Sequence, residues 1–228
     1  MNQAELRLIH QAASLLLCYP GEDWPRRLEL VRAALDPVRR GPAGRLRAFC
    51  ADAAALSPLV AGAEYVSTFD RTRRRTLHMT YYADGDTRRR GQSLVDIKTV
   101  YRAHGWEPDT GELPDFLPVM LEFAARVPDA GSRLLREHRP GLDLLLAGLV
   151  SHRSRYAAVV EAVAATLPRP TPADRRVTGE LAVLGPPQES VGRVSAVGGV
   201  PAVGHVPAVD HVPAVGHVPA SDIPRGTI

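Results

Sequence analysis

The sequence of 228 residues lacks the short motifs that mark most enzymes. It contains no G-x-G-x-x-G or P-loop phosphate-binding motif, no H-E-x-x-H metalloprotease motif and no G-x-S-x-G nucleophile elbow. Catalysis needs titratable groups that converge on one pocket, and no spacing in this chain indicates such a set. The sequence therefore predicts a protein that is not an enzyme, with no catalytic residue, no metal site and no cofactor.

Cysteine is also scarce, and long apolar runs are missing. Cys18 and Cys50 are the only two cysteines, and neither belongs to a C-x-x-C pair or to a cluster of metal ligands, so both are expected to be small buried apolar residues. No apolar run approaches the length that crosses a bilayer, and the N-terminus has neither the basic start nor the cleavage site of a secretory signal. These absences predict residence in the cytoplasm without stable membrane insertion.

Lysine is nearly absent, because 27 of the 28 basic residues are arginine and Lys98 is the only lysine. Arginine suits recognition of carboxylates and phosphates where it is concentrated locally. Here the bias runs along the whole chain, so we attribute it to codon composition.

The last part of the chain, residues 168–228, has no phenylalanine, tryptophan, tyrosine or cysteine, but it holds ten of the 20 prolines and eight of the 19 glycines. Over residues 200–217 it repeats V-P-A-V-G/D-H with a period of six. Such a segment cannot bury enough surface to offset the entropy of ordering it. We therefore expect a disordered low-complexity tail behind a domain of residues 1–167, and we attribute the repeated histidines to sequence drift rather than to metal binding.

Within residues 1–167, apolar residues recur at helical spacing, and alternation with a period of two is scarce. The predicted fold class is all-α, a compact bundle of about eight helices with short connections. Proline, glycine and capping residues divide the pattern. They predict helices around 6–17, 25–35, 46–56, 58–69, 94–101, 114–127 and 134–135, and one long final helix over 142–167.

The most informative segment is 64–91, EYVSTFDRTRRRTLHMTYYADGDTRRRG, which combines aromatic residues, acids and seven arginines without a catalytic spacing. Tyr65 and Phe69 are four residues apart and so share one face of a helix. Together with Asp70 and Arg73 they can offer an apolar anchor whose charged surroundings orient a bound peptide. Core burial explains the aromatic spacing equally well, and a solvated, ion-paired face explains the arginines, so both alternatives stay open.

Four segments carry a resemblance when they are taken in order: LLLCYP at 15–20, EYVSTFD at 64–70, LHMTYYADGDTRRRG at 77–91 and ELPDFLPVMLEFAA at 112–125. They resemble the NarJ family of nitrate reductase delta-subunit chaperones, which are relatives of the TorD and DmsD redox-enzyme maturation proteins. The resemblance implies a system-specific chaperone. Its partner would be the apo catalytic (alpha) subunit of respiratory nitrate reductase, bound by its N-terminal segment during molybdenum cofactor insertion and complex assembly, before membrane attachment.

The resemblance also implies a role for Asp115, because relatives carry an acid followed by a histidine at this motif, implicated in recognising the client's leader peptide. This chain has Phe116 in place of that histidine, so a role that rests on an imidazole is not carried over. Asp115 is equally explained as a first-turn residue that complements a helix dipole after Pro114. Glu122 is predicted to project to the same side as Asp115. The predicted peptide-binding residues are Tyr65, Phe69, Asp70, Arg73, Asp115 and Glu122.

Two other functions fit parts of the sequence. A sibling chaperone for another molybdoenzyme would show the same helical pattern, and co-purification of its client would distinguish it. The arginine clusters at 71–75 and 88–90 also suit a helical nucleic-acid binder, but the interleaved aspartates and the modest net charge of +3 disfavour that partner. His78, which lies in apolar company, is interpreted as a hydrogen-bonded structural residue.

Overall fold

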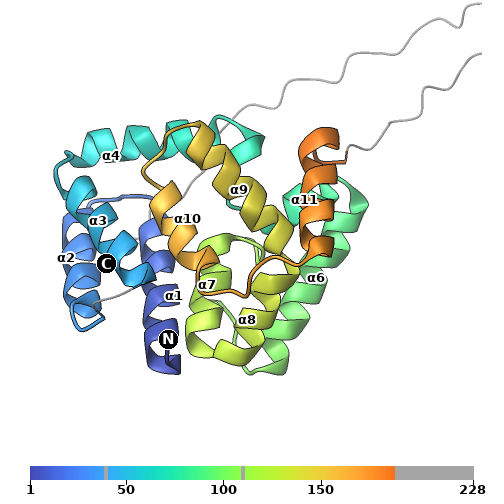
Figure 1. The fold of residues 1–228 in the computed structure, drawn as a ribbon, viewed down its shortest axis with the longest axis horizontal. Helices are drawn as coiled ribbons and strands as arrows, with labels where there is room; N and C mark the ends of the chain where they lie inside the picture. Colours follow the sequence, from blue (N-terminus) through green and yellow to red (C-terminus); the bar gives the residue numbers. More distant parts are fainter. Residues whose placement is uncertain (39–40, 109–110, 188–228) are drawn as a thin grey trace, which may run out of the picture. The chain divides into compact units, whose positions relative to one another are not determined.

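The computed structural model describes residues 1–38, 41–108 and 111–187, and the regular elements in this part of the chain are all helical. The first six α-helices are α1 (Gln3–Leu17), α2 (Trp24–Leu35), α3 (Pro42–Ala54), α4 (Pro58–Tyr65), α5 (Met79–Asp84) and α6 (Arg88–Ala103). The others are α7 (Leu117–Arg126), α8 (Pro128–Glu137), α9 (Arg139–Ser151), α10 (Ala157–Ala164) and α11 (Pro172–Leu184). A π-helical turn, η1 (Val66–Asp70), and a 3₁₀ turn, η2 (Arg73–Arg75), follow α4. The predicted all-α class is confirmed for these residues, with more helices than expected (Figure 1).

Local capping explains where several of these helices begin. At α1, the Asn2 side chain accepts a hydrogen bond from the Glu5 N–H at 2.8 Å, and the Glu5 carboxylate accepts one from the Asn2 N–H at 3.1 Å. Ser57 caps α4 as predicted, with Pro58 in the first turn. The starts of α1 and α4 are therefore encoded by the few residues around them.

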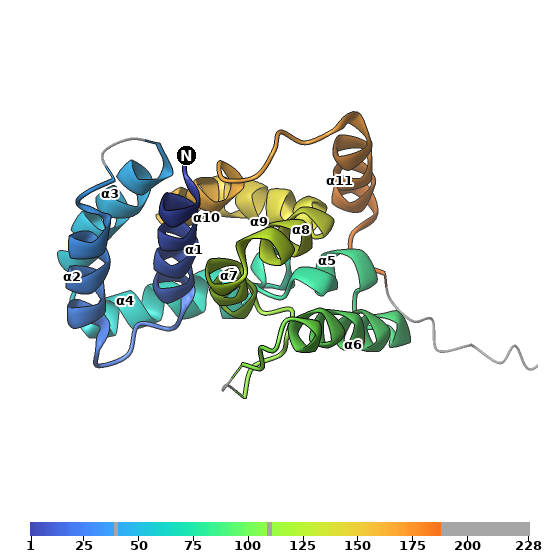
Figure 2. The same cartoon turned by 90° about the horizontal axis from the view of Figure 1, so that it is seen from below.

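Helix α1 lies at the centre of the core. It packs along α7 and also contacts α2 and α10, and both views show it between these helices (Figures 1 and 2). Ile9 and Leu16 of α1 are fully buried, as are Leu121 and Phe123 of α7. Burying a side chain of this size contributes about 1.5–3 kcal/mol. The α1–α7 pair therefore fixes the C-terminal end of α1 beside the first turns of α7.

The predicted long helix over 142–167 is wrong, because α9 and α10 are separate helices. Arg153 has φ 54°, a left-handed conformation through which a right-handed helix cannot continue. The Ser154 N–H then donates to the Leu149 carbonyl at 2.9 Å and closes the end of α9. No proline or glycine marks this break, so the apolar periodicity runs through it.

Helix α11 lies inside the segment 168–228, which its composition predicts to be disordered throughout. For residues 172–184 that prediction is wrong, because Thr171 and Asp174 form a capping box that favours a helix locally. None of the α11 residues is buried, although the helix contacts α9. The repeats at 200–217 lie outside the described residues.

The two cysteines differ in their surroundings. Both are free thiols, and Cys50 is fully buried, as predicted, so that burial raises the pKa of its thiol to about 11. Cys18 is only half-buried. Across the described residues, we find no helix with both the length and the apolar character needed to cross a bilayer.

Candidate functional site

A cavity of about 390 Å³ lies between the C-terminal end of α1, the π-helical turn η1 and the first turns of α7. We call it the α1–α7 cavity. It has room for several side chains but not for a whole helix, since a helix with its side chains is ~10–12 Å across. Its lining residues are Ser14, Cys18, Tyr19, Tyr65, Asp70, His78, Glu112, Phe116, Pro118, Val119 and Glu122.

Part of the wall is aromatic and aliphatic. Tyr19 is 54% exposed and packs edge-on against Tyr65, with ring centroids 5.4 Å apart. Phe116, Pro118 and Val119 form the part of the wall around the start of α7. A concave surface with exposed aromatic edges is suited to receiving apolar side chains of a partner.

Three carboxylates line the same cavity, and we call them the acidic rim: Asp70, Glu112 and Glu122. Asp70 and Glu112 are exposed, and Glu122 pairs with Arg126 at 2.9 Å. Among the residues that the structure describes, no lysine or arginine lines this cavity. The rim therefore favours a cationic group on whatever binds here.

The π-helical turn η1 sets the directions of the side chains of its last two residues, Phe69 and Asp70. Its hydrogen bond runs from the Arg71 N–H to the Val66 carbonyl, 3.2 Å away and five residues back. Turns of this type are frequent at functional sites. Asp70 is exposed at the cavity, whereas Phe69, one residue earlier, is directed into the core.

Tyr65 and Phe69 are both core residues, with exposed fractions of 6% and 5%. Their rings pack on Tyr156, with centroids 5.9 and 4.9 Å from it. The Tyr65 hydroxyl donates to the Leu17 carbonyl at 3.0 Å, and burial raises the pKa of this phenol far above its ordinary value. Core burial therefore accounts for Phe69, which does not line the cavity, whereas Tyr65 belongs to both the core and the cavity wall.

Asp115 is completely buried and supports the cavity wall through His78. Its carboxylate accepts hydrogen bonds from Nδ1 of His78 at 3.1 Å and from the hydroxyl and N–H of Thr80 at 2.5 and 3.3 Å, and Arg90 lies 3.5 Å away. Burial alone would raise the pKa of Asp115, but these hydrogen bonds and the charges of His78 and Arg90 outweigh it and hold the pKa below its ordinary value. Asp115 is thus an ionised acceptor, which makes Nδ1 of His78 the donor.

The backbone also fixes the position of His78. The Met79 N–H donates to the Asp115 carbonyl at 3.0 Å, and the Leu117 N–H donates to the Leu77 carbonyl at 2.8 Å. This antiparallel bridge sets His78 opposite Phe116, with ring centroids 5.4 Å apart, and both residues line the α1–α7 cavity. The cavity therefore has an imidazole although position 116 carries none. The structure confirms the predicted hydrogen-bonded state of His78. The sequence did not predict its place at the cavity, because its partner Asp115 is 37 residues away.

Three of the six predicted residues meet at one cavity: Tyr65, Asp70 and Glu122. Asp115 does not line it and is not a first-turn residue, because α7 begins at Leu117. The expectation that Asp115 and Glu122 project from one side of the same helix is wrong for this reason.

Arg73 lies away from the cavity and pairs with Asp86. The cluster at 88–90 is similarly engaged, since Arg89 pairs with Asp84 at 3.1 Å and Arg90 lies 3.7 Å from Asp86. These contacts favour the solvated, ion-paired face over a surface for nucleic acid, which needs uncompensated cations.

The arrangement has the chemistry of a binding site, with an aromatic wall, an acidic rim and an imidazole held by a buried acid. In the part of the chain that the structure covers, no group of three or more histidine, cysteine, aspartate or glutamate side chains is placed to hold a metal ion.

Comparisons with known proteins support the resemblance seen in the sequence. The family model of the nitrate reductase delta subunit matches residues 32–161, more than half of the chain. A Bacillus subtilis protein, "Probable nitrate reductase molybdenum cofactor assembly chaperone NarJ", is 32% identical over 169 residues, which cover 73% of this chain and 92% of that protein. The Escherichia coli K12 protein named nitrate reductase molybdenum cofactor assembly chaperone NarJ is 36% identical over 152 residues, or 65% of this chain and 64% of that protein.

Two further relatives differ in length or in sequence. The nitrate reductase-like protein NarX of Mycobacterium tuberculosis H37Rv is 40% identical over 161 residues, which cover 70% of this chain but 24% of that protein, so the chain spans about a quarter of that relative's length. A crystal structure described as a redox enzyme maturation protein from Archaeoglobus fulgidus matches with a TM-score of 0.52 at 21% identity, over 71% of this chain and 91% of that one, which shows a shared fold. The family match and the coverage of the Bacillus relative together establish that this chain belongs to the nitrate reductase delta subunit family.

Proposed function

We propose that this protein is a maturation chaperone for nitrate reductase. It binds the apo catalytic subunit in the cytoplasm, through that subunit's N-terminal segment, and supports molybdenum cofactor insertion and complex assembly before membrane attachment. It carries out no catalysis and holds no cofactor of its own. Family membership, the names of the NarJ relatives and a cavity suited to a peptide support this function.

The observation that carries the proposal is the pairing of an aromatic wall with an acidic rim in the α1–α7 cavity. An amphipathic helix binds to such a surface by inserting apolar side chains from one face, spaced three and four residues apart. Asp70, Glu112 and Glu122 then lie beside that face, where they favour basic residues of the client and set its direction. The cavity takes one anchoring turn, and the rest of the client helix stays outside.

His78 adds a polar contact to this anchor. Because Nδ1 donates to Asp115, Nε2 remains for a group of the client, and the buried carboxylate keeps the ring in one orientation. The exposed charges contribute only about 0–1 kcal/mol each, so the complex is reversible. A reversible complex is what a chaperone needs, since the client must leave once it has matured.

Titration with a peptide of the client's N-terminal segment tests the proposal. Asp70→Asn combined with Glu122→Gln should weaken binding by about threefold to tenfold at low ionic strength, since each exposed charge contributes up to ~1 kcal/mol. The control, Asp36→Asn with Glu161→Gln, has the same net charge but changes acids that do not line the cavity, and it should bind normally. Equal affinity of all three proteins would exclude the α1–α7 cavity as the site.

The identity of the client is tested separately, by purifying the tagged protein from its native cytoplasm and identifying what accompanies it. The expected partner is the apo catalytic subunit of nitrate reductase. Recovery of a different molybdoenzyme in its place would show a sibling chaperone of the same fold.

A further inference from the structure

Helix α4 presents an apolar row to solvent. Leu59, Ala63 and Val66 are spaced four and three residues apart, so they share one face that runs along α4 to the first residue of η1. All three are exposed, and Leu59 is 84% exposed. We call this row the α4 strip. The only charged residue between positions 57 and 69 is Glu64, which lies on another side of the helix and pairs with Arg155 at 2.8 Å.

Tyr19 connects the α4 strip to the α1–α7 cavity. Gly62 is three residues from Leu59 and four from Val66, so it borders the strip. A methyl group at Gly62 would lie 2.7 Å from the Tyr19 hydroxyl, which shows that Tyr19 packs directly on α4 at this border. Tyr19 also lines the cavity, as does Asp70, four residues after Val66. An apolar segment that is held in the cavity can therefore continue over Tyr19 onto the strip.

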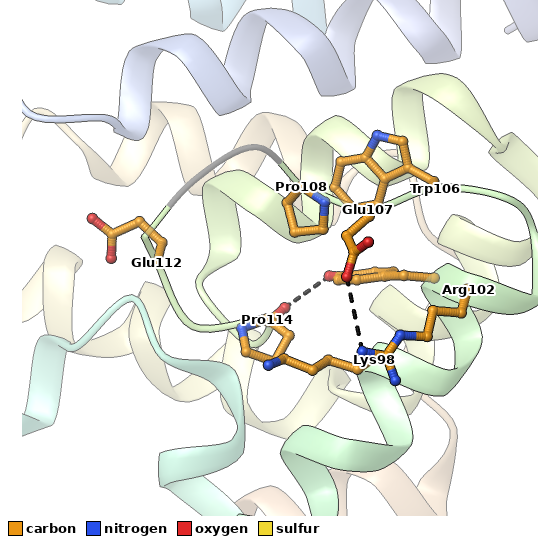
Figure 3. A pocket seen from close by; sticks show the side chains of 8 residues that line it. Lys98, Arg102, Trp106, Glu107, Pro108, Glu112 and Pro114 are labelled. Atoms are coloured by element: carbon orange, nitrogen blue, oxygen red, sulfur yellow. Dashed lines mark hydrogen bonds and ion pairs between the residues drawn. The ribbon is translucent and has the colours of Figure 1, made fainter.

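Another way out of the cavity passes Glu112, which also lines a smaller pocket. The described residues of that pocket include Lys98, Arg102 and Glu107, and Arg102 pairs with Glu107 at 3.8 Å (Figure 3). Charged groups of both signs lie along this path, and apolar side chains that covered them would remove them from water at a cost. The α4 strip imposes no such cost, so it is the favoured path for the apolar face of a helix.

The size of the α4 strip argues against a second copy of this chain as its partner. A stable interface between two proteins buries about 800 Å² on each, from roughly 20–30 residues a side. The strip offers three side chains and the neighbouring Val60, which is 50% exposed. This is enough for a helix that is already anchored in the cavity, because the second contact then forms within one complex, at a high effective concentration.

We propose that the α4 strip is the second contact surface for the client helix, which leaves the α1–α7 cavity over Tyr19 and packs along α4. This inference rests on the proposed function. Leu59 and Val66 are seven residues apart, a rise of about 10 Å or two helical turns. Ala63 between them is small, so a large apolar side chain of the client fits between its two neighbours. The client segment therefore carries apolar residues over three turns, one in the cavity and two on the strip.

The affinity test uses the full chain and a peptide of the client's N-terminal segment. Leu59→Gln should weaken binding by about threefold to tenfold, because it removes part of the apolar area that is buried. Ala63→Arg should weaken it further, because it fills the gap and adds a charge. The matched control is Leu184→Gln at the end of α11, where the leucine is 82% exposed and lies far from α4 in both views (Figures 1 and 2). It should bind normally, and all three variants should keep their helical circular dichroism because the changed side chains are exposed.

Shortened peptides give a second readout. When about seven residues are removed from either end of the peptide, one of the two products should lose its response to Leu59→Gln. The same product should still respond to Asp70→Asn with Glu122→Gln, because its anchoring turn remains in the cavity. This pair of responses supports the second contact.

Three results overturn the α4 strip and leave the proposed function standing. The first is a peptide that responds to the change at Asp70 and Glu122 but to neither Leu59→Gln nor Ala63→Arg. The second is tighter binding by Leu59→Gln, which would assign the strip to a segment of this chain that competes with the client. The third is a dimer in analytical ultracentrifugation that Leu59→Gln dissociates, which would assign the strip to a second copy. Failure of the unmodified protein to bind any client peptide overturns both proposals.

Discussion

The hydroxyl of Tyr65 donates a hydrogen bond to the backbone carbonyl of Leu17, 3.0 Å away, and so joins the end of α4 to the last turn of α1. Tyr65 is therefore both part of the cavity wall and a support for it. Tyr65→Phe removes only the hydroxyl and should lower the free energy of unfolding by about 1 kcal/mol. The Tyr65→Phe variant should bind the client peptide with an affinity close to that of the unmodified protein, and peptide titration measures this affinity.

Tyr65→Ala together with Phe69→Ala should have a different outcome, since both rings pack on Tyr156 in the core. Each loss of a buried aromatic side chain costs about 3–5 kcal/mol, and a whole domain has roughly 5–15 kcal/mol of stability. The double variant should therefore lose helical circular dichroism at much lower temperature. A melting curve like that of the unmodified protein would show that these rings are not part of the core.

Asp115→Asn should cost about 3 kcal/mol at neutral pH, because an amide cannot serve His78, Thr80 and Arg90 as the buried carboxylate does. The folded state holds the pKa of Asp115 low, so its stabilising contribution is complete above the ordinary carboxyl pKa of about 3.9 and is lost as the pH falls through the folded pKa. The difference in the free energy of unfolding between Asp115→Asn and the unmodified protein should shrink in that acid range.

Urea denaturation at several pH values measures this difference. The matched control is Asp86→Asn, because the Asp86 carboxylate is itself exposed to solvent. It should cost less than about 1 kcal/mol. Equal costs for the two substitutions would contradict the role given to Asp115.

His10 should make the domain sensitive to mild acid. It is fully buried on α1, with Nε2 2.9 Å from Oγ1 of Thr166, and burial lowers its pKa to about 4. An unfolded histidine titrates near 6.5, so the unfolded state binds the proton first as the pH falls. The contribution of neutral His10 to the free energy of unfolding is about 3 kcal/mol. It is complete above about pH 6.5 and is lost as the pH falls from there to 4.

His10→Gln should therefore flatten the dependence of stability on pH in this window. His152→Gln, which changes an exposed histidine, should leave the dependence as it is. Chemical denaturation at pH 7.5, 6 and 5 distinguishes the two. A slope that persists in His10→Gln would assign the acid sensitivity to another group.

Gly131 of α8 packs so closely on α7 that a methyl group at this position would lie 2.2 Å from the Ala124 Cα. Gly131→Ala should therefore push α7 and α8 apart and cost about 1–3 kcal/mol, despite the better helix propensity of alanine. Gly44 of α3 has open space at its Cβ position, so Gly44→Ala should stabilise the protein by about 0.5 kcal/mol. Thermal unfolding measures the effects of both substitutions. If Gly131→Ala stabilised the protein as Gly44→Ala should, the contact between α7 and α8 would be looser than described.

The helical class and most helix starts could be predicted because apolar periodicity and capping are local signals. Ser57 and Pro58 mark the start of α4, and Pro128 marks the junction of α7 and α8. The break at Arg153 could not be predicted, since a non-glycine residue in a left-handed conformation leaves no trace in the composition. Helix α11 is hidden for another reason, because the proline-rich sequence beyond it dominates the composition of the whole segment.

At the site, the sequence identifies residues but not their arrangement. Asp70 and Glu122 line one cavity as a result of the α1–α7 packing, and the pairing of Arg73 with Asp86 is set by tertiary contacts rather than by spacing. His78 reaches the cavity only because residues 77–79 pair with residues 115–117. The role of each of these residues in client binding stays a prediction.

The π-helical turn at Val66–Asp70 has a consequence for any redesign of this region. Because its hydrogen bond spans five residues, the turn contains one residue more than an α-helical turn. Because the π-helical turn absorbs one surplus residue, deleting Val66, whose side chain is exposed, should return the turn to α-helical hydrogen bonding while the residues after it keep their phase. The Asp70 carboxylate should then still face the cavity, so this turn can change length without losing the charge that it presents to a partner.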